Sequence, residues 1–540
     1  MKFTSERLKN SNYTIQISYE EALKNNEIIS LADSELLRTY RRINDIEFSQ
    51  YHIDELLQEK RTLKKEKDSK INRNRIFEIN KELEDILFVP DIISIHFNNV
   101  AHYKQIIKQG LFINNKKYIR LLTGAGHARR NTSIFAEESI CKKLINIFDN
   151  GRNKDIELNI NKFNSYFALY ASATHKVTAP RFVVVPDYEI TKNRNVDFVY
   201  EDENKIDHVE KRNIPIVQNI FDGQGIISLE FSKIWSSEME LDYIPNSFCI
   251  RGSFLKGQCV SFDIHGFAKE YNVENIIDVW GNLHNVNDID CILTASQFKL
   301  WSSYSNLENY KTNCESNNLS WGISRQTPKE EKKNFWSSYQ YIQVLDIDNK
   351  DIEYLCNDTI QYFKEISFES PEKSLLYLMG TSIEKFDETQ WKSIDNNYIK
   401  ALLINKNSSK DYFIKQYISR TLNKKIRESY TGGLLINGNY QVCISDPFAL
   451  CQHAFNLPVK GLLEEHEHYS SYWIEQNIFK VASGRSPLTW KSEMNTLNLI
   501  RNNEIDKWYG HLKSGIVFNI HGIDMMLYGD GDEQHCLLIQ

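Results

Sequence analysis

Two aspartates one residue apart, Asp530 and Asp532, lie between glycines in the stretch YGDGDEQ near the end of the 540-residue sequence. Carboxylate oxygens are the hard ligands that Mg²⁺ prefers. Aspartates at alternate positions of a tight loop can converge on one ion, and their mutual repulsion makes such a loop unfavourable without the metal and favourable with it. The stretch is therefore a candidate magnesium site, and a plain surface turn is the alternative.

Two lysines far upstream could bind an anion. Lys256 lies between the apolar residues of SFLKGQCVSF, directly before Gly257, and Lys299 follows Phe298 in SQFKLWSS. A lysine between strand-like apolar runs either extends its ammonium group to solvent or meets an anion. With Arg251 nearby, the sequence suggests a phosphate-binding set, and solvated charges at a sheet edge are the alternative.

The candidate residues fall into regions whose patterns predict different structures. Ile76, Ile79 and Leu83 continue a helical hairpin predicted for residues 33–88. The segments SFCIRGSF and GQCVSFDI alternate as strands do. GGLLINGNYQVCIS predicts a hairpin broken by glycines, and the charged residues 200–214 predict a linker.

A chain of this length predicts several domains. We expect an α+β protein with five regions: an N-terminal helical hairpin region (1–90), a mixed α/β domain (91–215), a first β domain (216–305), a helical connector (306–430) and a second β domain (431–540).

Composition excludes some classes of protein and leaves others open. The formal net charge of -7 excludes a uniformly basic coat for nucleic acid but allows a local basic groove. The nine cysteines are scattered singly, without C-x-x-C spacing, which predicts reduced thiols of a cytoplasmic protein. The start of the sequence has no apolar stretch typical of a signal peptide, and no apolar run is long enough to predict a membrane span.

An ordered series of motifs resembles one family. The string DGQGIIS…PNSFCIRGSFLKG resembles the DG-x-G-x-IS…PSAFQIR-x-x-x-x-KG pattern of cellular RNA-dependent RNA polymerases of the RNA-silencing type. It is more similar still to the single-chain, phage-encoded RNA polymerases related to them. Downstream, VASGRSPLTWKSEMNTL resembles the family's R-x-P-x-L stretch, and KWYGHLKSGIVFNIHGIDMMLYGDGD resembles its run into a D-x-D-G-D loop.

The resemblance implies a fold and a set of roles. Residues 216–305 and 431–540 would form two double-psi β-barrels. The implied activity is template-directed RNA synthesis from nucleoside triphosphates, with a DNA template, an RNA product and Mg²⁺ as cofactor. The resemblance implies these roles for the candidate residues: phosphate contacts by Lys256 and Lys299, nucleotide contacts by Arg485 and Arg251, and Mg²⁺ binding by Asp530 and Asp532.

Two departures from the family pattern leave alternatives open. The family loop has three aspartates, whereas here either Tyr528 replaces the first or Gln534 replaces the third. The apolar run CLLI after Gln534 favours the second register. Family members also continue well beyond the loop, so we expect an incomplete second barrel and no activity of this chain alone. Either a separate polypeptide supplies the rest, or the gene is interrupted. The alternatives are a catalytically inactive, nucleic-acid-binding remnant and an RNA-dependent RNA polymerase.

Overall fold

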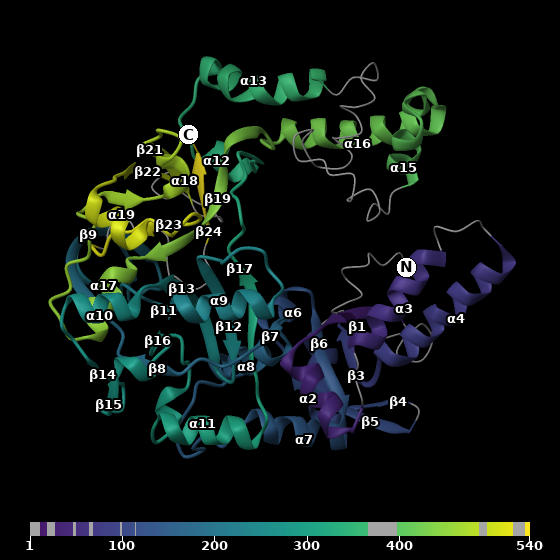
Figure 1. The fold of residues 1–540 in the computed structure, drawn as a ribbon, viewed down its shortest axis with the longest axis horizontal. Helices are drawn as coiled ribbons and strands as arrows, with labels where there is room; N and C mark the ends of the chain where they lie inside the picture. The colour runs from purple at the N-terminus through teal and green to yellow at the C-terminus, as the bar shows by residue number, and fades with distance from the viewer. Residues whose placement is uncertain are drawn as a thin grey trace. The chain divides into compact units, whose positions relative to one another are not determined.

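The computed structural model describes residues 11–18, 27–46, 50–63, 69–97, 100–113, 115–365, 397–484, 494–521 and 535–539 (Figure 1). The chain divides into two compact units. Unit 1 contains the described residues up to Thr327 together with Ser445–Gly461. Unit 2 contains the described residues of Pro328–Ile444 and of Leu462–His521, together with His535–Ile539. Within the described residues, no helix is both long and apolar enough to cross a membrane.

Unit 1 begins with a six-stranded sheet in the order β2-β1-β3-β6-β5-β4. Its core contains Ile92, Ile95 and Phe135, each with its side chain excluded from solvent. The strands are β1 (Ser11–Ser18), β2 (Glu27–Ala32), β3 (Phe88–His96), β4 (Leu111–Ile113), β5 (Lys116–Leu122) and β6 (Thr132–Glu137). The helices around it are α2 (Glu35–Ile43), α3 (Gln50–Leu63), α4 (Lys70–Leu87), α5 (Val100–Gln109), α6 (Ala125–Arg129) and α7 (Glu138–Phe148).

The predicted helical hairpin is present as α3 and α4, which contact each other, and Leu56 of α3 and Ile79 and Leu83 of α4 are buried. Its first arm is shorter than expected. The helix that contains Ile43 ends there as α2, and Asp45 follows with a positive φ of 50°. Because a left-handed residue cannot continue an α-helix, the sequence periodicity across this point overestimated the length of the arm.

A second sheet of unit 1 has seven strands in the order β7-β17-β12-β13-β11-β16-β8. Every residue of β11 is buried, because β11 lies between β13 and β16 with both faces covered. The strands are β7 (His175–Val177), β8 (Phe182–Val185), β11 (Gln224–Ser228), β12 (Ser247–Gly252), β13 (Leu255–Phe262), β16 (Cys291–Thr294) and β17 (Trp321–Gln326). The sheet therefore recruits strands from both sides of the region 216–305 in which the first barrel was expected.

Short helices and one small ribbon cover this sheet. Trp235 of α9 is fully buried and packs edge-on against Phe248, with ring centroids 5.2 Å apart. The remaining elements here are α8 (Ile160–Phe167), η1 (Ala168–Ala171), α9 (Leu229–Glu238), α10 (Ile264–Glu270), β14 (Asn275–Ile277), β15 (Leu283–Asn285), η2 (Val286–Asp288), η3 (Trp301–Ser303) and α11 (Leu307–Ser316).

A buried carboxylate organises the ribbon of β14 and β15. Asp278 accepts hydrogen bonds from the backbone amides of Trp280 (3.0 Å) and Asn282 (2.8 Å) and lies 2.8 Å from Nε2 of His284. Burial raises the pKa of Asp278, but these hydrogen bonds outweigh it and leave the pKa below its usual value. The carboxylate is therefore ionised at neutral pH and stabilises the turn.

Residues 200–214, expected as a linker, belong to a long antiparallel hairpin. The strands β9 (Glu189–Glu201) and β10 (Asp207–Asn219) pair along their whole length, from Glu189 opposite Asn219 to Glu201 opposite Asp207. The expectation was wrong because the charged residues of this segment occupy exposed sides of a two-stranded ribbon, where no buried face imposes an apolar alternation.

A segment of the predicted second β domain belongs to unit 1. The helix α17 (Pro447–Ala454) places Phe448 against Phe267 of α10, with ring centroids 5.1 Å apart. Just before it, Ser445 forms two hydrogen bonds with Gln224, whose Nε2 donates to the Ser445 carbonyl (2.7 Å) and whose Oε1 accepts from the Ser445 amide (2.8 Å).

Unit 2 combines helices with a closed circuit of strands. The order is β18-β19-β23-β20-β22-β21-β24, and β24 also pairs with β19. The strands are β18 (Asn334–Trp336), β19 (Leu435–Ser445), β20 (Glu467–Tyr469), β21 (Lys480–Gly484), β22 (Met494–Leu499), β23 (Ile516–Phe518) and β24 (His535–Ile539). The helices are α12 (Tyr339–Gln343), α13 (Asn349–Glu365), α15 (Asn397–Ile404), η6 (Lys406–Lys410), α16 (Tyr412–Tyr430), α18 (Ser471–Ile474) and α19 (Asn503–Tyr509).

One expectation about this barrel is corrected, and one stays a prediction. The stretch GGLLINGNYQVCIS forms one long strand, β19, instead of a hairpin, because its glycines precede the strand or lie within it without a turn. The incompleteness of the second barrel stays a prediction, and its described strands form a closed circuit. The apolar residues after Gln534 form β24, which pairs with both β21 and β19 and so leaves no open edge between them.

Candidate functional site

The two predicted phosphate-binding lysines lie where two backbone segments of unit 1 pair, residues 254–256 and residues 297–299. We call this pairing the crossing. Leu255 and Phe298 form an antiparallel bridge, and both are fully buried. The Lys256 amide donates to the Gln297 carbonyl at 3.0 Å, and the Lys299 amide donates to the Phe254 carbonyl at 3.0 Å. Both lysine side chains are partly exposed, and each follows a buried residue in the sequence, Leu255 or Phe298. Residues far apart in the sequence therefore present two ammonium groups from neighbouring backbone segments.

Close backbone contacts explain the glycines of the two motifs at this crossing. The Gln258 amide donates to the Gly223 carbonyl at 2.9 Å. Gly257 has a φ of +156°, and a Cβ there would lie 2.4 Å from the Gly223 oxygen. A Cβ on Gly225 would lie 2.4 Å from the Ile292 oxygen. Only glycine lets the DGQG segment and the KG segment approach this closely.

A buried glutamine, which the sequence reasoning missed, holds the crossing together. Gln297 has no exposed surface. Its Oε1 accepts from the Thr294 amide at 3.2 Å, and its Nε2 donates to the Gln258 carbonyl at 3.0 Å. Its side chain thus satisfies backbone groups of two different strands, next to Lys256 and Lys299. The only sequence signal was its position two residues before Lys299 at the end of an apolar run.

The surroundings of Lys256 contain a phenol and a carboxylate. Tyr166 of α8 has a raised pKa, first because of burial and then because of the negative charge of Asp222, while the positive charge of Lys256 opposes the shift. Asp222 is the first residue of the DGQG motif, so this motif brings a carboxylate to the vicinity of the lysine. The glycines of the motif were recognised from the sequence, whereas Asp222 and Tyr166 were not among the predicted site residues.

Arg251 lies directly across the β12–β13 ladder from Lys256. Its Nη1 donates to the carbonyl of its own neighbour Ile250 at 2.8 Å. The side chain also lines a small pocket together with Glu35, Arg38 and Thr174. The guanidinium therefore has polar groups of its own unit nearby, and its contact with a nucleotide stays a prediction.

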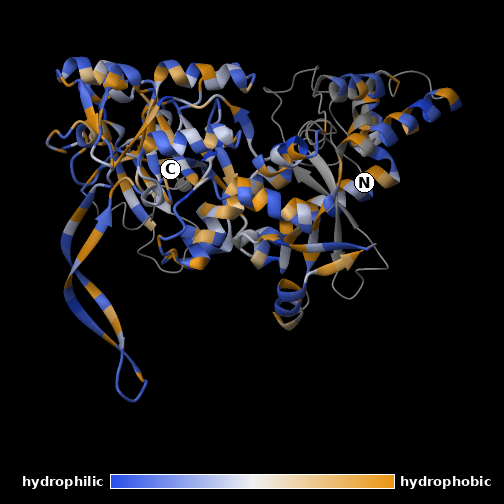
Figure 2. Ribbon diagram, turned by 90° about the horizontal axis from the view of Figure 1, so that it is seen from below, coloured by the Kyte–Doolittle hydropathy of each residue, from blue (hydrophilic) through white to orange (hydrophobic). Residues whose placement is uncertain are grey.

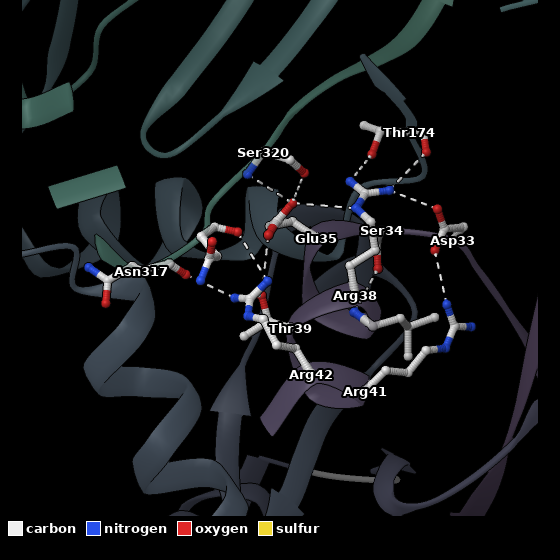
Figure 3. A network of polar contacts seen from close by, with 12 residues as sticks. Asp33, Ser34, Glu35, Arg38, Thr39, Arg41, Arg42, Thr174, Asn317 and Ser320 are labelled. Atoms are coloured by element: carbon white, nitrogen blue, oxygen red, sulfur yellow. Dashed lines mark hydrogen bonds and ion pairs between the residues drawn. The ribbon is translucent and has the colours of Figure 1, made fainter. Parts of the chain in front are cut away.

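The other side of that pocket is a polar network that fixes α2 to the seven-stranded sheet (Figure 3). Arg38 donates to Asp33 at 2.7 Å and to the Thr174 hydroxyl at 2.9 Å. Glu35, with 8% of its surface exposed, accepts hydrogen bonds from the amide and the hydroxyl of Ser320. The segments before β7 and β17 are thereby held to one helix, which fixes the edge of the sheet beside Arg251.

The predicted nucleotide and metal ligands of the second barrel, Arg485, Asp530 and Asp532, lie outside the described residues. The strands that flank them are neighbours, because Gly484 at the end of β21 pairs with Leu537 near the start of β24. Among the described residues, no group of three or more His, Cys, Asp or Glu side chains gathers as a metal site would. The metal ligands therefore stay a prediction.

Comparisons with known proteins agree with the fold and with the motif series. No protein-family model matches the chain. The chain is 26% identical over 488 residues to the DNA-directed RNA polymerase YonO of Bacillus phage SPbeta, an alignment that covers 87% of this chain and 53% of that protein. The chain therefore spans about half the length of this curated relative.

Among solved structures, the RNA dependent RNA polymerase QDE-1 from Thielavia terrestris matches with a TM-score of 0.59 and 13% sequence identity, over 98% of this chain and 53% of that chain. At this level of identity the match shows the fold. It confirms the α+β class and the two-barrel architecture expected from the motifs. The chain thus has the double-psi β-barrel fold of this polymerase and resembles, over most of its length, a phage-encoded DNA-directed RNA polymerase.

Proposed function

We propose that the protein is a template-directed RNA polymerase that copies DNA into RNA. One observation carries the proposal: Lys256 and Lys299 project from a single glycine-dependent crossing of the first barrel, in a chain similar to a DNA-directed RNA polymerase. The ligands that follow from this proposal are nucleoside triphosphates, a DNA template and an RNA product. The setting would be the cytoplasm of a bacterial host cell.

The lysines would bind the phosphates of a nucleotide or of the transcript end. An ammonium group donates up to three hydrogen bonds and acts as a compact positive charge toward phosphate. Asp222, which lies in the same surroundings as Lys256, would keep that ammonium oriented until a phosphate displaces it. Arg485 would approach the incoming nucleotide from the second barrel.

Asp530 and Asp532 would hold Mg²⁺, because two carboxylates at alternate positions are a donor set that suits this ion. When bound, the ion stabilises the charges of the attacking and leaving oxygens in phosphoryl transfer. The missing third carboxylate of the family loop would make binding weaker.

Incorporation of labelled nucleotides on a DNA template tests the proposal, with an RNA template in parallel. Alanine at Lys256 and Lys299 should each lower extension about 10- to 100-fold, since a charge-assisted hydrogen bond contributes about 1.5–3 kcal/mol. Alanine at Lys233, an exposed lysine of α9 in the same unit, is the matched control and should leave extension unchanged. Measurable extension by the parent that the double lysine variant matches would exclude the phosphate role.

A second candidate is a catalytically inactive protein that binds nucleic acid. The stretch YGDGDEQ favours it, because it has one aspartate fewer than the family loop. Lysine-dependent binding of triphosphates or nucleic acid without extension on either template would support this candidate. Extension restored by adding a second polypeptide would instead support the expected two-chain enzyme. Preference for the RNA template would support the RNA-dependent alternative.

A further inference from the structure

The hairpin of β9 and β10 has no role in the chemistry proposed above. Figure 2 shows it as a long twisted ribbon that leaves the elements around it. Each strand has 13 residues, which corresponds to a length of roughly 43 Å. The two strands pack chiefly on each other. Isolated two-stranded ribbons are marginally stable in water, so a ribbon of this length suggests a partner that binds along it.

The two faces of this ribbon, here called the arm, differ in charge. Along β9 exposed and half-buried residues alternate strictly. The half-buried face carries three cations and one carboxylate, namely Lys192, Arg194, Arg212 and Glu210. The opposite face carries four carboxylates and one lysine, namely Glu189, Asp197, Glu201, Asp207 and Lys211. A polyanion would therefore be attracted to the first face and repelled by the second.

The cationic face also contains ordered aromatic rings. The Arg212 guanidinium lies 4.3 Å from the ring centroid of Phe198 and 4.9 Å from that of Tyr200. His208 stacks on Tyr200 with centroids 5.5 Å apart. Cation–π contacts hold the guanidinium in place while its edge can still donate hydrogen bonds. Arg212 is thus preorganised on the rings, although Glu210 also pairs with it.

The three cations Lys192, Arg194 and Arg212 lie at successive positions along one face of the arm, because Arg212 is opposite Val196. Lys192 and Arg194 lie two residues apart on one face, which corresponds to roughly 6.7 Å along a strand. We propose that the arm binds the sugar–phosphate backbone of double-stranded DNA through Lys192, Arg194 and Arg212. This inference rests on the proposed function in that the duplex is the template.

Binding of a labelled duplex longer than the arm, followed by fluorescence anisotropy at several salt concentrations, tests the inference. The variant Lys192→Gln/Arg194→Gln should lower affinity about tenfold per lost contact at 0.1 M salt and reduce the slope of log affinity against log salt by about 1.8, since each phosphate contact contributes about 0.9. Adding Arg212→Gln should reduce both the affinity and the salt slope further. The matched control is Lys211→Gln, which removes a cation from the opposite face of the arm and should not weaken binding.

Several outcomes would overturn the inference. The parent protein could fail to bind the duplex at low salt. The double variant could keep the affinity and the salt slope of the parent, or Lys211→Gln could lose as much affinity as the double variant. A change in self-association with unchanged duplex affinity would assign the face to protein contacts instead. Nucleotide extension is measured on the same samples. Duplex binding that depends on the arm, without extension even after a second polypeptide is added, would refute the proposed function and leave this inference standing.

Discussion

Replacing Gln297 by leucine tests how the lysine crossing is built. The substitution keeps a side chain of similar size but removes the amide that bridges two strands. The Thr294 amide would lose its acceptor at 3.2 Å, and the Gln258 carbonyl would lose a donor at 3.0 Å. Gln297 is fully buried, so water cannot replace either partner without opening the structure.

The expected loss can be worked out from these two groups. Leaving a buried donor or acceptor unsatisfied costs about 1–3 kcal/mol. Two such groups, partly offset by the better burial of leucine, should lower the local free energy of opening by about 3 kcal/mol. This corresponds to roughly a hundredfold change in the opening equilibrium, at 1.4 kcal/mol for each factor of ten.

Amide hydrogen exchange measures this opening directly. Peptides that cover residues 254–260 and 291–299 should exchange roughly a hundredfold faster in Gln297→Leu. The affinity for a nucleoside triphosphate should fall as well, because Lys256 and Lys299 depend on the crossing. Gln361→Leu is the matched control, since Gln361 is exposed on α13 and its substitution should leave both peptides unchanged. Unchanged exchange in Gln297→Leu would refute the reasoning.

Three further predictions concern the frame around the site. Gly257→Ala should lower the melting temperature far more than Gly281→Ala. Both glycines have a positive φ, so the backbone cost is common to them. A Cβ at Gly257 would lie 2.4 Å from a carbonyl oxygen, whereas a Cβ at Gly281 would meet no atom within 4 Å. Asp278→Asn should be destabilising at pH 7. Because the pKa of Asp278 is lowered in the folded state, its contribution is present above the unfolded pKa of about 3.9 and is lost as the pH falls through the folded value. Urea denaturation of parent and variant should therefore converge at acidic pH, and a constant difference would contradict the assignment. Glu35→Gln should raise the proteolysis rate at residues 317–320, because the carboxylate that holds this segment to α2 loses its charge; an unchanged rate would show that the network contributes nothing there.

The sequence by itself determined the fold class and the order of the motifs. Local backbone conformation restricts which residues can occupy a position. The glycines of DGQG and KG and the alternation around Lys256 therefore indicated turns and strands without a structure. The strand after Gln534 was predicted for the same reason, since the apolar run CLLI needs a partner on a sheet. The hairpin of α3 and α4 followed from helical periodicity.

Only the tertiary structure decided how distant segments meet. Lys256 and Lys299 lie on the same crossing because the buried Leu255 and Phe298 pair across it and because Gln297 ties the strands together. The pairing of β24 with β19 and β21 and the packing of α17 in unit 1 also depend on contacts between residues far apart in the sequence. The arm was missed because charged residues lie on both of its faces and obscure the alternation of exposed and half-buried residues along β9. Pairing between residues far apart depends on packing that a local pattern does not encode.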